Sequence, residues 1–398
     1  KDESFHFGPE YIIPKPFDTR VLTRVAPAVA KAAMDSDVAR VTIKDLKEYA
    51  LNLEDRLGTS ATLMKSLRDR LSTHVHDMER KVRMVFAEGE NSRILQAVNL
   101  ILEEDKIKPI LLGDEECIKS KISQLGLSSL EGVEIVNPVK SKKFDQYAQE
   151  LCEKRQRSGV SIYHAQDKMK RETYFGSKML EHQEADAFIA GPTLNYPNCF
   201  VPLMQVIGTK KKRSAAGIFI LVFRNRILFL ADCTAQIDPN EEQLSEIAFS
   251  TAELYRDLMR RDPRIAFLSF SSFGSNDHPN AEKVKKAVKL TKERFPELTV
   301  DGEVQADVAV NKQILDKLFE FSTLDAPTDI LIFPELNSAN IGYKLIQQLS
   351  EADAIGPILV PMNSAANIIQ RTASVNEIVN MSTVTALSAM EQKSRNEK

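Results

Sequence analysis

Short apolar runs alternate with amphipathic segments along the chain from about residue 80 onward. Buried strands are predicted at 82–87, 109–112, 133–136 and 185–190, and the segments between them carry helical spacing, as at 93–104. Strand–helix–strand order with crossovers of this length predicts a parallel sheet covered by helices on both faces. Gly89 and Gly191 follow two of these runs, at the positions where open α/β sheets bind ligands.

The pattern changes at 215–232, where two β-rich runs come close together. Residues 217–223 and 226–230 are separated only by Arg224-Asn225, which predicts a β-hairpin. A helix that ends at Met259 is predicted next, and further apolar runs follow at 264–269 and 329–333. The regular alternation of strands and helices is therefore interrupted at 215–232.

The first 80 residues follow a helical pattern instead. Residues 20–34 form an alanine-rich apolar helical pattern, and 44–80 are charged with leucines at helical spacing. Gly58-Thr59-Ser60 predicts a break between two helices in the second segment. This segment is either a spacer or oligomer contact, or a solvated linker, and the pattern supports both equally.

Composition limits the classes of function. A chain of 398 residues with 43% hydrophobic residues predicts two or three domains with substantial cores. The net charge of −3 gives no reason to expect nucleic acid or an anionic membrane as a partner. No apolar run reaches the ~18–20 residues that span a bilayer, and no secretory signal opens the chain, so a cytoplasmic location is expected. The four cysteines form no Cys-x-x-Cys pair, so no metal site is predicted.

A stretch near the end of the chain, residues 361–380, carries the candidate chemistry. Ser374 followed three residues later by Glu377 is a capping box, which satisfies amide donors at a helix start. Gln370 and Arg371 come just before it. One interpretation is a capped helix with a surface arginine. The other is that the guanidinium beside a helix N-terminus binds an anion such as a phosphate or a coenzyme.

The same stretch resembles the C-terminal signature of phosphate acetyltransferases. That signature usually reads serine-arginine-glycine-cysteine-threonine followed by an acidic pair; here it reads Gln370-Arg371-Thr372-Ala373-Ser374, then Asn376-Glu377. Phe86-Ala-Glu-Gly-Glu-Asn-Ser-Arg-Ile-Leu95 and the segments 270–275 and 336–344 resemble the family in the same order. The resemblance covers roughly 80–390. It implies a two-lobed α/β fold, similar to isocitrate and isopropylmalate dehydrogenases, with parallel sheets flanked by helices, one β-hairpin and a coenzyme A cleft.

The resemblance also implies roles for individual residues. Glu377 takes the position of the base, Arg371 that of the phosphate-binding cation, and Gln370 that of the oxyanion donor. Glu377 is longer by a methylene than the family's aspartate, a shift of ~1 Å that can cost ~10²-fold, and Gln370 is bulkier than serine. We therefore expect these three to be vestigial as catalytic residues. The acetyl-CoA-binding set implied is Arg371, Gln370, Asn363, Ser271, Ser275, Asn340, Tyr343 and Lys344.

A second resemblance concerns the start of the chain. Phe17-Asp-Thr-Arg20 and Val25-Ala-Pro-Ala-Val-Ala-Lys-Ala-Ala-Met34 are similar to the closing stretch of the catalytic domain in bacterial hybrid NADP-dependent malic enzymes. Together the resemblances imply a malic-enzyme tail at 1–40, a helical linker at 41–80, a first transferase-like lobe at 81–206 with 355–398, and a second lobe at 207–354. NADP and a divalent metal, Mg²⁺ or Mn²⁺, would then belong to a catalytic domain preceding Lys1.

Three functions follow from these resemblances. The first is a regulatory module that binds acetyl-CoA and inhibits the oxidative decarboxylation of malate to pyruvate and CO₂. The second is an active phosphate acetyltransferase, which converts acetyl-CoA and phosphate to acetyl phosphate and coenzyme A. The third is a module that only builds the oligomer. The resemblance implies a homodimer through this half within a larger assembly.

Overall fold

The computed structural model describes the chain apart from residues 1–23, 44, 47–48, 50–58, 325–326 and 397–398. It divides into two compact units, residues 1–66 with 223–226 and residues 67–222 with 227–398. Helix α1 (Ala26–Asp35) confirms the later part of the helix predicted at 20–34. Helix α3 (Thr59–Asp77) begins at the predicted break, and most of the helix predicted before it lies outside the described residues.

The first sheet has the strand order β11-β4-β1-β2-β3, and every neighbouring pair is parallel. Its strands are β1 (Val82–Phe86), β2 (Ile107–Leu112), β3 (Glu134–Val136), β4 (Ala187–Ala190) and β11 (Ala365–Ile368). Four of them are the apolar runs predicted before residue 200. The parallel sheet predicted from their order is confirmed.

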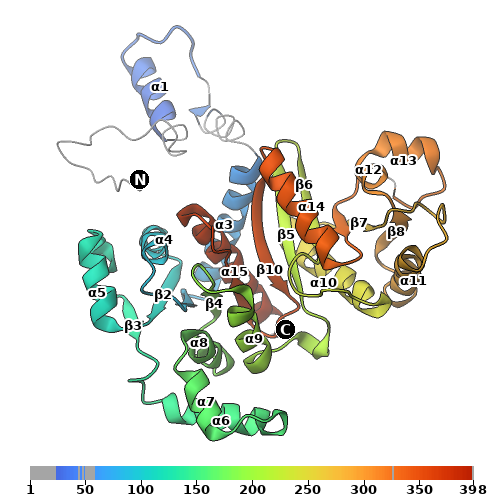
Figure 1. Cartoon of the computed structure of the whole chain (residues 1–398). Coiled ribbons are helices and arrows are strands. Elements are labelled where there is room, and N and C mark those ends of the chain that lie inside the picture. Colours follow the sequence, from blue (N-terminus) through green and yellow to red (C-terminus); the bar gives the residue numbers. More distant parts are fainter. Residues whose placement is uncertain (1–23, 44, 47–48, 50–58, 325–326, 397–398) are drawn as a thin grey trace. The chain divides into compact units, whose positions relative to one another are not determined.

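Helices cover both faces of this sheet (Figure 1). Met84 and Phe86 of β1 pack in one hydrophobic core, while Val85 packs in the other, because successive side chains of a strand point to opposite faces. The helices are α4 (Ser92–Glu103), α5 (Glu115–Gln124), α6 (Phe144–Arg155), α7 (Ile162–Met169), α8 (Glu172–Glu181), α9 (Tyr196–Val206) and α15 (Val375–Asn396). Burial on both faces explains why the strands read as continuous apolar runs.

The second sheet has the order β10-β5-β6-β9-β7-β8 and is mixed. Strands β5 (Ala216–Phe223) and β6 (Arg226–Ala231) confirm the predicted hairpin, and β10 (Asp353–Val360) runs antiparallel to β5. The other members are β7 (Arg264–Leu268), β8 (Thr299–Val304) and β9 (Ile330–Ile332). Its helices are α10 (Glu241–Met259), α11 (Pro279–Arg294), α12 (Ala306–Val310), α13 (Lys312–Leu318) and α14 (Leu336–Leu349).

In the described part of the chain, no helix is long and apolar enough to cross a lipid bilayer.

Strands β8, β10 and β11 were not predicted, because each contains residues that weaken a strand pattern. Strand β8 carries Asp301 and Glu303, both buried, and β10 carries Gly356 and Pro357. The lobe boundary predicted at 354–355 stays a prediction, but β10 belongs to the second sheet and β11 to the first. The chain therefore crosses between the sheets at 361–364.

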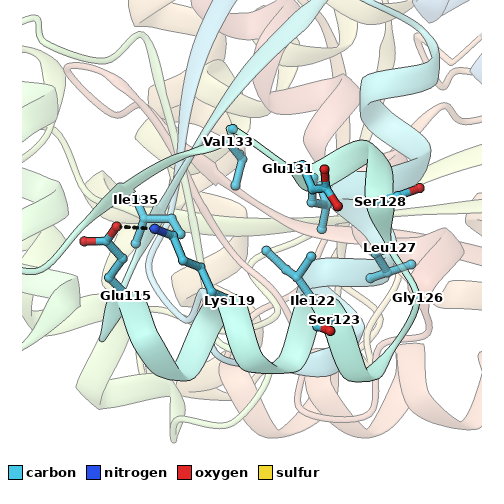
Figure 2. Close-up of a pocket in the computed structure, with 12 residues that line it drawn as sticks. Glu115, Lys119, Ile122, Ser123, Gly126, Leu127, Ser128, Glu131, Val133 and Ile135 are labelled. Atoms are coloured by element: carbon cyan, nitrogen blue, oxygen red, sulfur yellow. Dashed lines mark hydrogen bonds and ion pairs between the residues drawn. The ribbon is translucent and has the colours of Figure 1, made fainter.

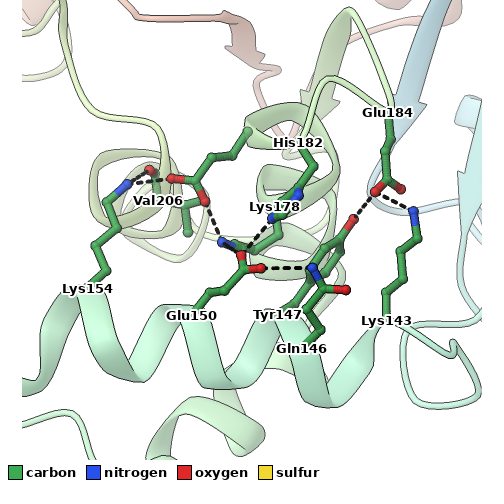
Figure 3. Close-up of polar contacts among 10 residues, drawn as sticks. Lys143, Gln146, Tyr147, Glu150, Lys154, Lys178, His182, Glu184 and Val206 are labelled. Atoms are coloured by element: carbon green, nitrogen blue, oxygen red, sulfur yellow. Dashed lines mark hydrogen bonds and ion pairs between the residues drawn. The ribbon is translucent and has the colours of Figure 1, made fainter.

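A network of charged side chains ties α6 to α8 (Figure 3). Lys178 is almost fully buried, and its Nζ lies 2.5 Å from carboxylate oxygens of both Glu150 and Glu181. His182 Nε2 lies 2.6 Å from Glu150 Oε2. The two carboxylates and this histidine could converge on a metal ion, but Lys178 already places a positive charge between the carboxylates. The cluster therefore has an internal cation and reads as a structural ion network.

This network predicts a pH-dependent contribution to stability. Burial opposes ionisation of Glu150, but hydrogen bonds from Lys178, His182 and Gln146 outweigh it and lower the pKa of Glu150 from 4.5 to about 2. An acid whose pKa is lowered by folding stabilises the fold above its unfolded pKa and loses that contribution as pH falls toward the folded value. We expect Glu150→Gln to lower the free energy of unfolding by about 1–3 kcal/mol at pH 7.

That difference between wild type and variant should shrink steadily from pH 4.5 downward. Urea unfolding at several pH values between 3 and 7 measures it. Glu153→Gln is the matched control, since Glu153 is exposed on the same helix and, among the described residues, accepts only from Gln149. A wild-type-to-variant difference that stays constant with pH would rule out an ionised Glu150 as its source.

Candidate functional site

A pocket of about 400 Å³ lies at the carboxyl ends of β4, β6 and β11, beside α14. Ends of parallel strands are where open α/β sheets bind ligands, and this volume is within the usual range for a small-molecule site. Five of the residues predicted from the sequence line it: Gln370, Arg371, Asn340, Tyr343 and Lys344. The pocket thus brings together predicted residues from two segments of the chain, 340–344 and 370–371.

Two features bring the loops after β4 and β11 close together. Gly191 has a φ of +120°, and a Cβ atom there would lie 2.4 Å from the carbonyl oxygen of Ile369, so only glycine fits. Arg93 on α4 donates to the carbonyl oxygens of Arg371 at 3.0 Å, Ala373 at 2.6 Å and Pro192 at 2.9 Å. Arg93 is therefore a positioning residue for the backbone around Arg371.

Asp232 builds the wall that follows β6. It is buried, and its carboxylate accepts hydrogen bonds from the backbone N–H groups of Gly217, Thr234, Ala235 and Gln236. Burial raises the pKa of Asp232, and these backbone donors oppose that rise. The loop places Thr234 in the pocket wall, where its hydroxyl lies 2.9 Å from the hydroxyl of Tyr196.

Gln370 fills the floor of the pocket. Its Nε2 donates to the hydroxyl of Tyr343 at 3.3 Å, and the Tyr343 ring stacks on Phe219 with centroids 4.1 Å apart. Burial raises the pKa of Tyr343, so its hydroxyl stays neutral at physiological pH. The amide group of Gln370 is therefore held by a neutral aromatic partner in the pocket wall.

The charge in the pocket wall is positive. Arg371 is exposed and donates to Asn195 Oδ1 at 3.2 Å, and the Nζ of Lys344 lies 5.2 Å from the centroid of the Tyr343 ring. No carboxylate lines this pocket among the described residues. The remaining wall is mainly apolar, with Leu194, Leu336 and Ile368. The site is thus suited to an anionic ligand with an apolar part.

Glu377 lies outside this pocket. Its Oε2 accepts from the backbone N–H of Ser374 at 2.7 Å, and Ser374 Oγ accepts from the N–H of Glu377 at 3.2 Å. This is the capping box predicted as the simpler interpretation. Glu377 lines a separate small cavity of about 20 Å³, which it shares with Gln370. Its carboxylate therefore serves the start of α15.

Three other predicted residues lie away from the pocket. Asn363 Nδ2 donates to the carbonyl oxygen of Ile207 at 2.9 Å. Ser271 is buried and donates to Glu303 Oε1 at 3.1 Å, while Ser275 Oγ accepts from the N–H of Ser272 at 3.0 Å. These side chains form hydrogen bonds that hold their loops in place, and none of them lines the 400 Å³ pocket. Their predicted contact with a coenzyme stays a prediction.

A larger pocket of about 510 Å³ lies between α5 and β3 (Figure 2). Its walls carry Ile122, Val133 and Ile135, and Lys119 pairs with Glu115 at 2.6 Å on its rim. It contains none of the residues predicted for a site. The smaller pocket is therefore the better candidate, because charge and predicted residues meet there.

Comparison with known proteins places this geometry in a family. Residues 66–386 match the family described as Phosphate acetyl/butaryl transferase. The chain belongs to the phosphate acetyl/butaryl transferase family. A phosphotransacetylase from Streptococcus pyogenes superposes with a TM-score of 0.77 at 31% identity, covering 83% of this chain and 98% of that one. The EutD phosphotransacetylase from Staphylococcus aureus gives 0.73 at 30% identity, covering 82% and 99%. The predicted transferase-like fold is confirmed.

Curated relatives extend the similarity toward the start of the chain. The NADP-dependent malic enzyme of Escherichia coli is 35% identical over 398 residues, 98% of this chain and 51% of its own length. The phosphate acetyltransferase of Thermoanaerobacterium thermosaccharolyticum is 33% identical over 78% of this chain and 95% of its own length. This member of the transferase family thus spans about half the length of the malic enzymes it matches. The predicted resemblance to both groups is confirmed.

Several residues that build the site received no role from the sequence. Arg93 stands in the motif that resembles the family's opening helix, and Asp232 follows a predicted strand. The sequence therefore marks both positions, but it does not reveal their hydrogen-bond partners. Asn195 and Tyr196 follow Gly191 at a strand end, which was a usable signal. The partners of these four are distant along the chain, and only the structure reveals them.

Proposed function

We propose that this chain binds acetyl-CoA as a regulatory part of an NADP-dependent malic enzyme and that its capacity for acetyl transfer is impaired. The observation that carries the proposal is that the predicted binding residues line the pocket, whereas the predicted base lies outside it. Gln370 and Arg371 line a pocket suited to an anionic ligand, while the carboxylate of Glu377 is held in the capping box. Binding groups are thus kept at the pocket, and the proposed base is not.

The ligand class follows from the charge and shape of the pocket. Arg371 and Lys344 favour phosphate or pyrophosphate groups, and the apolar wall suits the acyl and pantetheine portions of a coenzyme A ester. Acetyl transfer also needs a base within about 2.6–3.2 Å of the thiol proton. Glu377 is the only residue that the family resemblance implies for that role, and it does not line the pocket.

The regulatory part of the proposal rests on the extent of the similarities. Phosphate acetyltransferases align with 78–79% of the chain, whereas NADP-dependent malic enzymes align with 96–98%. We propose that acetyl-CoA bound here lowers the rate of malate decarboxylation through a coupling free energy between two sites. NADP and the divalent metal of that reaction are assigned to other parts of the enzyme, and this half contributes to a homodimer in a cytoplasmic assembly.

Calorimetric titration of acetyl-CoA into the 398-residue chain tests the proposal, with acetyl phosphate formation assayed on the same sample. Binding without turnover is the expected result. Turnover at a rate typical of enzymes, on the order of 10 s⁻¹, would favour an active phosphate acetyltransferase. Neither binding nor turnover would leave the role of building the oligomer as the better account.

Arg371→Ala is expected to weaken acetyl-CoA binding by about 5–30-fold, because one charge-assisted hydrogen bond to a phosphate group contributes about 1–2 kcal/mol. The dissociation constant from calorimetry measures it. Arg157→Ala is the matched control, since Arg157 is exposed on another part of the surface. Equal affinities for the two variants would exclude Arg371 from the binding site.

A further inference from the structure

Another cavity, of about 70 Å³, lies where the chain crosses between the two sheets. It is bounded by the end of β10 and the start of β11, by α10, and by the last turns of α15. Lys210, Ser250 and Arg395 line it from three different elements. None of these residues lines the 400 Å³ pocket, so the two sites are separate.

Lys210 is the first charged residue of the basic run Lys210-Lys-Lys-Arg213. Its backbone is fixed by a hydrogen bond from its N–H to the carbonyl oxygen of Pro361 at 2.8 Å. Its ammonium group has no hydrogen-bond or ion-pair partner among the described residues, although the side chain is half-buried. Burial and then the nearby Arg395 lower the pKa of Lys210, and the attraction of Glu253 and Asp257 offsets this only in part.

The carboxylates around the cavity are already paired. Glu253 accepts from Arg213 at 3.0 Å, and Asp257 pairs with Arg395. Each of these two carboxylates is therefore paired with an arginine, and neither forms an ion pair with Lys210. A half-buried, uncompensated ammonium costs free energy unless an anion enters beside it.

Ser250 provides an independent observation. Its side chain is 1% exposed, and its hydroxyl has no hydrogen-bond partner in the part of the chain that the structure describes. The next residue, Thr251, shows the usual arrangement in a helix, with its hydroxyl donating to the carbonyl oxygen of Ile247 at 2.7 Å. A buried hydroxyl without a partner is costly, and an oxygen atom in the cavity would satisfy it.

We infer that this cavity binds a compact oxyanion, inorganic phosphate or the terminal phosphoryl group of a larger molecule, held by Lys210, Arg395 and the hydroxyl of Ser250. A cavity of 70 Å³ accommodates several waters or one tetrahedral anion. Because α10 packs on the second sheet and α15 on the first, the bound ion joins elements of both sheets. The inference does not depend on the function proposed for the larger pocket.

Titration of inorganic phosphate into the 398-residue chain tests the inference, with Arg371→Ala as background so that the larger pocket contributes less. Lys210→Met should weaken phosphate binding at least tenfold, and Ser250→Ala should weaken it about three- to tenfold, whereas Lys210→Arg should retain it. Lys211→Met is the matched control, because Lys211 is the exposed neighbour, and it should change affinity less than twofold. A thermal melt of each variant shows whether it is folded.

Two results would overturn the inference. One is the absence of saturable phosphate binding up to about 10 mM, which would mean that water alone occupies the cavity. The other is equal affinity of Lys210→Met and Lys211→Met. Glycerol 3-phosphate distinguishes the two sources of the anion: binding comparable to phosphate indicates a phosphoryl group of a larger molecule, and binding of phosphate alone indicates the free ion. Both of these outcomes support the site.

Discussion

Asp232→Ala is expected to lower the free energy of unfolding by about 3–5 kcal/mol, the largest effect of any substitution proposed for the site. The carboxylate is buried and accepts from the N–H groups of Gly217 at 2.8 Å, Thr234 at 2.9 Å and Gln236 at 2.6 Å. Alanine leaves these donors buried without an acceptor, and each such group costs about 1–3 kcal/mol if it stays unsatisfied.

Urea unfolding followed by circular dichroism measures the effect. Asp238→Ala is the matched control, because Asp238 is 78% exposed and pairs with Lys283 at the surface, where an ion pair contributes at most about 1 kcal/mol. Asp232→Asn keeps one acceptor oxygen and should fall between wild type and Asp232→Ala. A loss below 1 kcal/mol for Asp232→Ala would show that water replaces the carboxylate, and the wall of the pocket would then need another support.

The second large effect concerns catalysis. The double variant Gln370→Ser, Glu377→Asp is expected to raise acetyl transfer between acetyl phosphate and coenzyme A by about 10²-fold, because a displacement of ~1 Å in a reacting group can cost that factor. Serine removes the amide that contacts Tyr343, which opens the floor of the pocket. Aspartate is one methylene shorter than glutamate, so we expect its carboxylate to be held less firmly by the N–H of Ser374 in the helix cap.

The gain should come with a loss of stability, since the capping box contributes about 0.5–2 kcal/mol. Initial rates at saturating substrates measure activity, and thermal melting measures the cap. The two single variants are the controls, and each should gain less than the double variant because the roles are coupled. An unchanged rate in a folded double variant would mean that positions 370 and 377 are not what limits transfer.

The strands that could be predicted are those whose apolar residues face two cores. Strand β1 and the hairpin of β5 and β6 are continuous apolar runs bounded by turn residues, so local pattern is enough. Strand β8 could not be predicted, because Asp301 in its centre is buried against donors from elsewhere in the chain, Lys292, Ser322 and Thr323. Such partners are set by packing and leave no periodic signal.

The site divides in the same way. Gln370 and Arg371 could be predicted, because the stretch that carries them resembles a family signature. The placement of Ser271 could not, since its hydroxyl donates to Glu303 on a strand that itself escaped prediction. The basic run at Lys210 was visible as charge, but its nearness to Ser250 and Arg395 depends on the crossing between sheets.

The amino-acid sequence by itself determined the α/β class, the hairpin, the helix cap at Ser374 and the family resemblance. These are local properties, because hydrophobic period, turn residues and capping act over a few neighbouring positions. Only the tertiary structure decided that Glu377 serves the cap and does not line the pocket, and that Arg93 and Asp232 hold the site. Hydrogen-bond partners and burial join residues far apart in the chain, so they exist only after the sheets and helices have packed.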